Sequence, residues 1–244
     1  MANPVLNSKT FSAPSVATGA ETMTIEGTAN KTGLLLLICL ATSSWIWTQT
    51  YHAIDPSGAW PWVIGGAFGG LVVGIATSVK PGWAPITAPL YAALEGLFLG
   101  AISAQYAAAY PGILVQAVSL TFATLLVMLL LYRSGAIRVT PRFQKVMLVA
   151  MLAIGLYYVA TIMLGLFGVD TSYFNAGGPL GITLSVVIVG VAALTLLLDF
   201  DMIAKGVEQG APKAMEWYGA FGLMVGLVWL YLEILRLLGK INRR

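Results

Sequence analysis

The sequence contains few charged residues. Lysine, arginine, aspartate and glutamate together make up 9% of the 244 residues, whereas 58% of the residues are hydrophobic. About a quarter of the residues of a typical soluble domain are charged, so this composition excludes an ordinary water-soluble fold. We therefore expect a protein that resides in the lipid bilayer.

Cysteine and histidine are nearly absent, with one of each, Cys39 and His52. A single cysteine excludes an intrachain disulfide and a thiol cluster for zinc. His52 lies between two apolar runs, as an interfacial residue or an external pH sensor, so a serine hydrolase would lack its buried base. An aspartyl protease needs two acids that share a proton, and Asp199 has no obvious second aspartate. We expect neither an enzyme nor a bound cofactor.

Seven apolar segments are each long enough to cross the membrane as a helix, which takes about 20 residues. They are approximately Gly33 to Thr50, Trp60 to Val79, Ala84 to Ala109, Gly112 to Tyr132, Gln144 to Phe167, Pro179 to Phe200 and Trp217 to Leu238. Short connections between them predict an all-α membrane protein, a seven-transmembrane helix bundle.

The flanking segments are polar. Residues 1–32 form a polar tail that we expect to end in a short interfacial helix at Met23 to Lys31, residues 33–238 form the transmembrane domain, and residues 239–244 form a basic tail.

Lysine and arginine occur in alternate connections. The first, third and fifth connections have none, whereas the N-terminal tail and the other connections contain Lys9, Lys31, Lys80, Arg133, Arg138, Arg142, Lys145, Lys205 and Lys213. This pattern follows the positive-inside rule, indicates no nucleic-acid binding and predicts a cytosolic N-terminus. Seven crossings would then place the basic residues 236–244 outside. Either the last segment crosses against its charge bias or it returns to the cytosolic side, and we favour a full crossing.

The second apolar segment is rich in glycine. Gly65 and Gly69, Gly66 and Gly70, and Gly70 and Gly74 each form a small-xxx-small pair, which allows close approach of two helices. Packing within the bundle is the simpler interpretation, and a homo-oligomer through this segment is the alternative.

Glu95 is an acid in the middle of the third segment, which contains no basic residue. An ionisable side chain at the bilayer midplane costs about 2.5–3.5 kcal/mol and therefore faces a protein interior or a wet path. Helical spacing places Tyr91, Glu95 and Tyr106 on one face, with Ser103 near its edge. Two interpretations remain, a functional proton or ion site and a protonated acid that only holds helices together.

Asp199 follows three leucines at the expected cytosolic end of the sixth segment, where the helix dipole disfavours an anion. We expect it to point inward, with Lys80 and Arg133 on the same side as candidate partners. A proton that competes with a cation for an acid makes a pH-sensitive contact. Asp201, by contrast, is one turn from Lys205 and forms a local pair.

Glu233 lies near the end of the last segment, one turn before Arg236. A local pair at this position more often anchors a helix than takes part in a mechanism.

Several motifs and their order resemble the Bax inhibitor-1 (YccA) family. These are TIEGTANKTGLLL before the first segment, LYAALEGLFLGAIS in the third, LLLDFDMIAKGVEQGAP at the end of the sixth and WYGAFGLMVGLVWLYLEILRLLGKI in the last. The resemblance covers nearly the whole chain from Met23. It implies a seven-helix bundle with the last helix at the centre, and a proton-regulated calcium leak.

The resemblance also implies site residues. In relatives an aspartate ending the sixth span bonds to a second aspartate in the seventh, and a basic residue ending the second span engages the first. Asp199 matches the first position and Lys80 the basic one. The second aspartate is missing, because its position falls near Leu223 to Gly226. Either Glu233 or Glu95 replaces it, or this branch lacks a two-carboxylate sensor; we prefer Glu95.

The resulting hypothesis is a multipass protein of the bacterial cytoplasmic membrane that passes Ca²⁺ or another cation under control of protons. Its site residues are Asp199, Glu95, Glu233, Lys80, Tyr91 and Tyr106, with Asp199 and Glu95 as candidate transient calcium ligands. The alternative is a non-conducting partner of a membrane-anchored AAA protease, which the resemblance also implies, with residues 3–30 as the segment presented to it.

Overall fold

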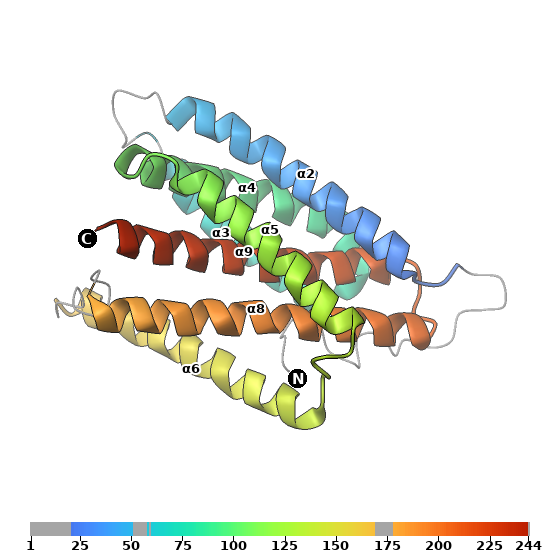
Figure 1. The fold of residues 1–244 in the computed structure, drawn as a ribbon. Helices are drawn as coiled ribbons and strands as arrows, with labels where there is room; N and C mark the ends of the chain where they lie inside the picture. The colour runs from blue at the N-terminus through green and yellow to red at the C-terminus, as the bar shows by residue number, and fades with distance from the viewer. Residues whose placement is uncertain (1–20, 51–57, 59, 169–177, 244) are drawn as a thin grey trace.

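Seven long α-helices make up the part of the chain that the structure describes (Figure 1). The computed structural model describes residues 21–50, 58, 60–168 and 178–243, so Lys9, His52 and Arg244 lie outside the described residues. The helices are α2 (Ile25–Thr50), α3 (Trp60–Val79), α4 (Ala84–Ala109), α5 (Ile113–Arg133), α6 (Pro141–Leu166), α8 (Pro179–Glu208) and α9 (Met215–Asn242). Each is long and apolar enough to cross a membrane. The prediction of an all-α seven-helix bundle is confirmed.

Successive helices run in opposite directions (Figure 1). One end of the bundle, which we call the basic end, contains the start of α2 and the α3–α4, α5–α6 and α8–α9 connections. The last helix spans the bundle completely. Near its start Glu216 pairs with Lys31 of α2, and near its end Lys240 donates a hydrogen bond to the carbonyl of Gly181 at the start of α8, at 3.2 Å. The last segment therefore does not turn back.

Helix α9 lies at the centre of the bundle. It packs against α2, α4, α5 and α8, and single side chains extend its contacts to the remaining two helices. Phe221 of α9 meets Tyr91 of α4 beside Gly74 of α3, and Glu233 of α9 bonds to Tyr158 of α6. The predicted central position of the last helix is confirmed.

Helices α2 and α8 extend furthest beyond the segments that hydropathy predicts. The residues 25–31 expected to form a separate interfacial helix are instead the first turns of α2, because Thr28 and Thr32 bond to backbone carbonyls one turn earlier and are buried. Helix α8 continues past Phe200 to Glu208, with Ile203 and Gly206 buried. Asp199 is therefore well inside a helix, and the expectation that it lies at the helix end, where the helix dipole disfavours an anion, was wrong.

Most glycines of α3 and α4 pack within the molecule; Gly65 is the exception, since nothing lies within 4 Å of its added Cβ. A Cβ added to Gly66 of α3 would lie 2.8 Å from the carbonyl oxygen of Leu94 in α4. A Cβ on Gly100 of α4 would lie 2.5 Å from the carbonyl oxygen of Ser43 in α2. These glycines allow close contacts of α3 with α4 and of α4 with α2, so α4 is held on both sides.

Candidate functional site

Asp199 is a residue of α8, and its side chain lies against the central helix α9. Its side chain is fully buried, with 0% of its surface exposed. A Cβ added to Gly226 of α9 would lie 3.0 Å from the Asp199 Oδ2 atom. The carboxyl group therefore occupies space that any larger residue at position 226 would need. This glycine falls in the stretch where the resemblance places a second aspartate.

Glu95 is a residue of α4, and its side chain lies against the neighbouring helix α3. It is buried, and a Cβ added to Gly70 of α3 would lie 2.7 Å from its Oε1 atom. The side chain of Tyr91, one turn earlier, interacts with the Glu95 carboxyl group. The Tyr91 ring meets Phe221 of α9 edge-on, with centroids 4.9 Å apart. Both interior acids are thus placed against a glycine of a neighbouring helix.

Glu233 takes part in a three-residue polar cluster. It is buried and accepts hydrogen bonds from Arg236 at 2.9 and 3.1 Å, so the expected local pair is present. Tyr158 of α6 donates a further bond to Glu233 at 2.6 Å and accepts one from Arg236 at 2.5 Å. The cluster joins α6 to α9. Tyr158 was not identified from the sequence, because nothing there relates two residues that lie 75 positions apart.

The remaining predicted site residues meet other partners. Lys80 is exposed, with its ammonium group 4.3 Å from the ring centroid of Trp83, whereas Asp199 is fully buried. The Tyr106 ring packs on Gly239 near the end of α9. The structure therefore does not place Lys80 in the interior beside Asp199, and Tyr106 does not share the surroundings of Glu95.

Two further polar contacts complete the picture of the predicted residues. Ser103, at the edge of the predicted face, shares a hydrogen bond of 2.6 Å with Tyr231 of α9. Asp201 pairs with Lys205 at 2.5 Å, as the local spacing indicates. The first contact joins α4 to the central helix, whereas the second lies within one turn of α8.

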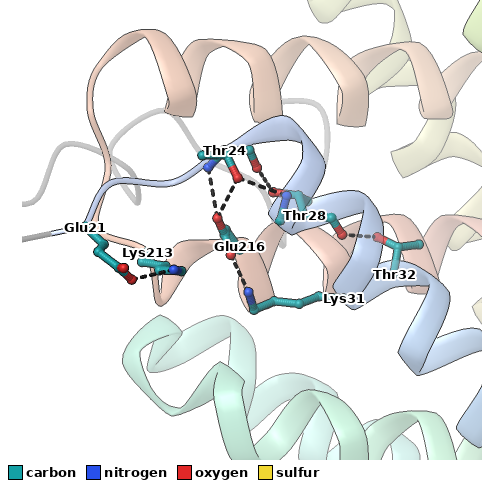
Figure 2. A network of polar contacts seen from close by, with 8 residues as sticks. Glu21, Thr24, Thr28, Lys31, Thr32, Lys213 and Glu216 are labelled. Carbon is teal, nitrogen blue, oxygen red and sulfur yellow. Dashed lines mark hydrogen bonds and ion pairs between the residues drawn. The ribbon is translucent and has the colours of Figure 1, made fainter.

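A polar cluster at the basic end was not identified from the sequence (Figure 2). Glu216 of α9, 1% exposed, accepts hydrogen bonds from the Thr24 backbone N–H at 3.0 Å and from the Thr24 hydroxyl at 2.9 Å. Lys31 forms an ion pair with its other carboxylate oxygen. We call Thr24, Lys31 and Glu216 the Glu216 cluster. Gly27 packs directly on the Glu216 carboxylate, which leaves no room for a side chain.

Main-chain contacts extend this attachment to the α8–α9 connection. The N–H of Met23 bonds to the carbonyl of Ala211 at 2.7 Å, and the N–H of Lys213 bonds to that of Glu21 at 3.1 Å. The side chains of Lys213 and Glu21 also form an exposed ion pair. The hydrogen bond between these two side chains raises the pKa of Lys213. The segment preceding α2 is thus fixed to the start of the central helix. The sequence signal that could have identified Glu216 is an acid in the first turn of a membrane-spanning helix.

A preformed metal centre is not found among the residues that the structure describes, where no three His, Cys, Asp or Glu side chains cluster. A cation in the interior would meet the separate carboxylates of Asp199 and Glu95. Such a site suits weak, transient binding of a hard cation by oxygen ligands.

Comparison with known proteins identifies one match. A model of the family described as Bax inhibitor 1 like matches residues 3–243. No curated protein and no solved structure matches the chain.

Proposed function

Because the chain belongs to the Bax inhibitor 1 like family of membrane proteins, we propose that it is a pH-sensitive leak for calcium or another cation, controlled by buried carboxyl groups. The observation that carries the proposal is the placement of Asp199 and Glu95. Each acid is buried inside a bundle of membrane helices and lies against a glycine of the neighbouring helix, Gly226 or Gly70.

The protonation state of each acid decides how well it fits. A neutral carboxyl group in such a contact fills space and needs only a hydrogen bond. An ionised carboxylate in the membrane interior costs several kcal/mol unless a cation or water accompanies it. Ionisation therefore favours entry of water and cations between α8 and α9 at Asp199, and between α3 and α4 at Glu95. Helix contacts that depend on a proton are the proposed basis of pH control.

Calcium flux in proteoliposomes that contain an encapsulated calcium dye tests the proposal. The wild-type protein should show flux that changes with pH. Asp199→Asn keeps the shape of the acid without its charge, so this variant should show, at every pH, the flux that the wild-type protein shows at low pH. Glu95→Gln should reduce the pH dependence for the same reason. Flux equal to that of empty vesicles would reject the leak.

Asp201→Asn is the matched control. It removes the same charge from the same helix two residues later, but Asp201 pairs with Lys205 at the side of the helix. We expect its flux and pH profile to match those of the wild-type protein. If Asp201→Asn and Asp199→Asn altered flux equally, the effect would come from surface charge and not from the buried acid.

The second candidate function is a regulatory partner of a membrane protease. The observation that favours it is the attachment of residues 21–24 to the α8–α9 connection, which fixes where the N-terminal segment leaves the bundle. Deletion of residues 1–20 should then abolish co-purification with the protease and leave calcium flux unchanged. We also propose that the protein lies in the bacterial cytoplasmic membrane with its N-terminus in the cytosol. A homo-oligomer is a further proposal.

A further inference from the structure

A cavity of about 360 Å³ lies within the bundle, apart from Asp199 and Glu95. Its lining comes from α2, α4, α5 and the central helix α9. The volume falls in the range of about 300–1,000 Å³ that small-molecule sites occupy. The cavity therefore has the size of a ligand site, and its position and chemistry indicate which ligand.

The cavity opens sideways, toward the lipid. Its floor is buried and includes Ser103, Leu227 and Tyr231, whereas Leu40 of α2 and Phe122 of α5, which also line it, are 47% and 43% exposed. Helices α2 and α5 have little contact with each other, and α4 and α9 lie behind them (Figure 1). Because both flanking helices are membrane spans, a molecule that enters between them comes from the bilayer.

The cavity lies in the half of the membrane away from the basic end. It is lined by residues 36–48 in the second half of α2 and by residues 114–122 in the first half of the antiparallel α5. Trp47 and the exposed Thr48 lie at its outer limit, near the end of α2. Tryptophan is typical of the membrane–water interface, so the cavity extends from the headgroup level into the hydrocarbon region.

The lining recognises hydrocarbon and no charge. Its members are mostly apolar, and its polar groups are hydroxyls, the Cys39 thiol and the Trp47 indole N–H. No Asp, Glu, Lys, Arg or His contributes among the residues that the structure describes. Ser103 and Tyr231 at the floor already bond to each other at 2.6 Å. An ionised headgroup inside the cavity would have no countercharge, and burial of such a group is costly. Burial of a hydrocarbon chain in the cavity carries no such cost.

We propose that this cavity binds one acyl chain of a phospholipid from the leaflet opposite the basic end, with the headgroup remaining at the level of Trp47 and Thr48. We commit to a phospholipid because the cavity opens toward the bilayer, of which phospholipids are the main component, and because a free fatty acid whose carboxylate entered the cavity would find no cation there. The cavity lining contains neither Asp199 nor Glu95, nor the glycines Gly226 and Gly70 against which they pack.

Photolabelling of the full chain tests the proposal. The protein is placed in phosphatidylethanolamine–phosphatidylglycerol nanodiscs that contain a phospholipid with a diazirine in one acyl chain, and labelled residues are mapped by mass spectrometry. We expect several-fold more label on cavity residues than on the lipid-facing residues Val149 and Leu156 of α6, which are 66% and 70% exposed. Equal labelling of both surfaces would overturn the proposal.

A matched pair of variants on α5 separates the cavity from the general lipid surface. Val118 lines the cavity, whereas Val115 on the same helix is 70% exposed and lies outside it. Val118→Trp should abolish the excess label, and Val115→Trp should leave it unchanged. Excess label that persists in Val118→Trp would overturn the proposal. If Val118→Trp fails to fold, the distribution of label in the wild-type protein decides by itself.

Native mass spectrometry identifies the occupant. Wild-type protein and Val115→Trp should retain a single phospholipid at collision energies that remove the other lipids, and Val118→Trp should lose it. An adduct with the mass of a free fatty acid, or no retained lipid at all, would overturn the proposal.

Discussion

Gly226 of the central helix lies directly against the carboxyl group of Asp199 on α8, so close that a single added methyl group would stand 3.0 Å from Oδ2. The distance between α8 and α9 at this position therefore depends on both residues, because Gly226 has no side chain and Asp199 has a short one. Both are inside the bundle, where packing is dense and small changes in volume are felt. This contact is the part of the proposed site most open to direct measurement.

Gly226→Ala should destabilise the bundle. The added Cβ would also lie 3.3 Å from Leu196 Cδ2. The side chains of Asp199 and Leu196 must therefore shift by a few tenths of an ångström in a densely packed region, at a cost of about 1–3 kcal/mol for overpacking. Thermal unfolding in detergent measures the loss of stability, with unfolding monitored through the reaction of a thiol-sensitive dye with the buried Cys39. Combining it with Asp199→Ala should recover part of the loss, because the carboxyl group is removed.

Gly190→Ala is the control for that experiment. Gly190 lies on the same pair of helices, in α8, but nothing is within 4 Å of its added Cβ. Alanine is favoured over glycine in a helix by about 1 kcal/mol, so this variant should be neutral or slightly more stable. Equal destabilisation by both substitutions would contradict the Asp199–Gly226 contact.

The Glu216 cluster should control how firmly the segment before α2 is held. In Glu216→Ala, the Thr24 N–H and the Lys31 ammonium lose their acceptor. Hydrogen bonds to charged groups contribute about 1.5–3 kcal/mol, so we expect a loss of that order. Hydrogen exchange of the Thr24 amide, which bonds to the Glu216 carboxylate, should accelerate in parallel.

Glu21→Ala provides the comparison at the same end of the bundle. Its ion pair with Lys213 is exposed, with 74% and 51% of the two side chains accessible. Exposed pairs contribute about 0–1 kcal/mol, so stability should hardly change and Thr24 should stay protected. Protection of Thr24 that survived in Glu216→Ala would show that the main-chain contacts alone hold this segment.

Hydropathy was sufficient to identify the seven helices, because each crosses about 30 Å of hydrocarbon and carries the required apolar run. It failed where polar residues continue a helix. The first turns of α2 contain Glu26 and Lys31, which end the apolar signal, yet burial of Thr28 against Gly219 of α9 keeps them helical. Tertiary contacts of this kind leave no periodic trace in the sequence.

Asp199, Glu95 and Glu233 were identified from the sequence because an acid in an apolar run is conspicuous, whereas the buried Glu216 was not. The neighbours of these acids were not identified either. That Asp199 meets Gly226, and that Glu216 meets Thr24, depends on how α9 is rotated in the bundle, which composition does not determine. Lys80 was placed at the correct end of α3, but the preference of its ammonium for the nearby Trp83 ring was not anticipated.

Tyr158→Phe should weaken the contact between α6 and α9. The phenol hydroxyl bonds to both Glu233 and Arg236, whereas these two remain paired without it. We expect a loss of about 1–2 kcal/mol, since a bond to a charged group is lost while the ion pair persists. Tyr157→Phe, at the adjacent position, should cost less. Equal melting temperatures for the two variants would show that the hydroxyl of Tyr158 contributes nothing to this helix contact.

The two ends of the bundle should face opposite sides of the membrane, with the basic end in the cytosol. In a Cys39→Ser background, Pro111→Cys and Asn242→Cys place a thiol at one end and Arg138→Cys at the other, all three at exposed positions. An impermeant thiol reagent added to intact cells should label the first two variants and should label Arg138→Cys only after permeabilisation. The reason is that lysine and arginine are retained on the cytosolic side during insertion. The reverse pattern would invert the orientation, and labelling of Asn242→Cys together with Arg138→Cys would mean that α9, although continuous, does not cross the bilayer.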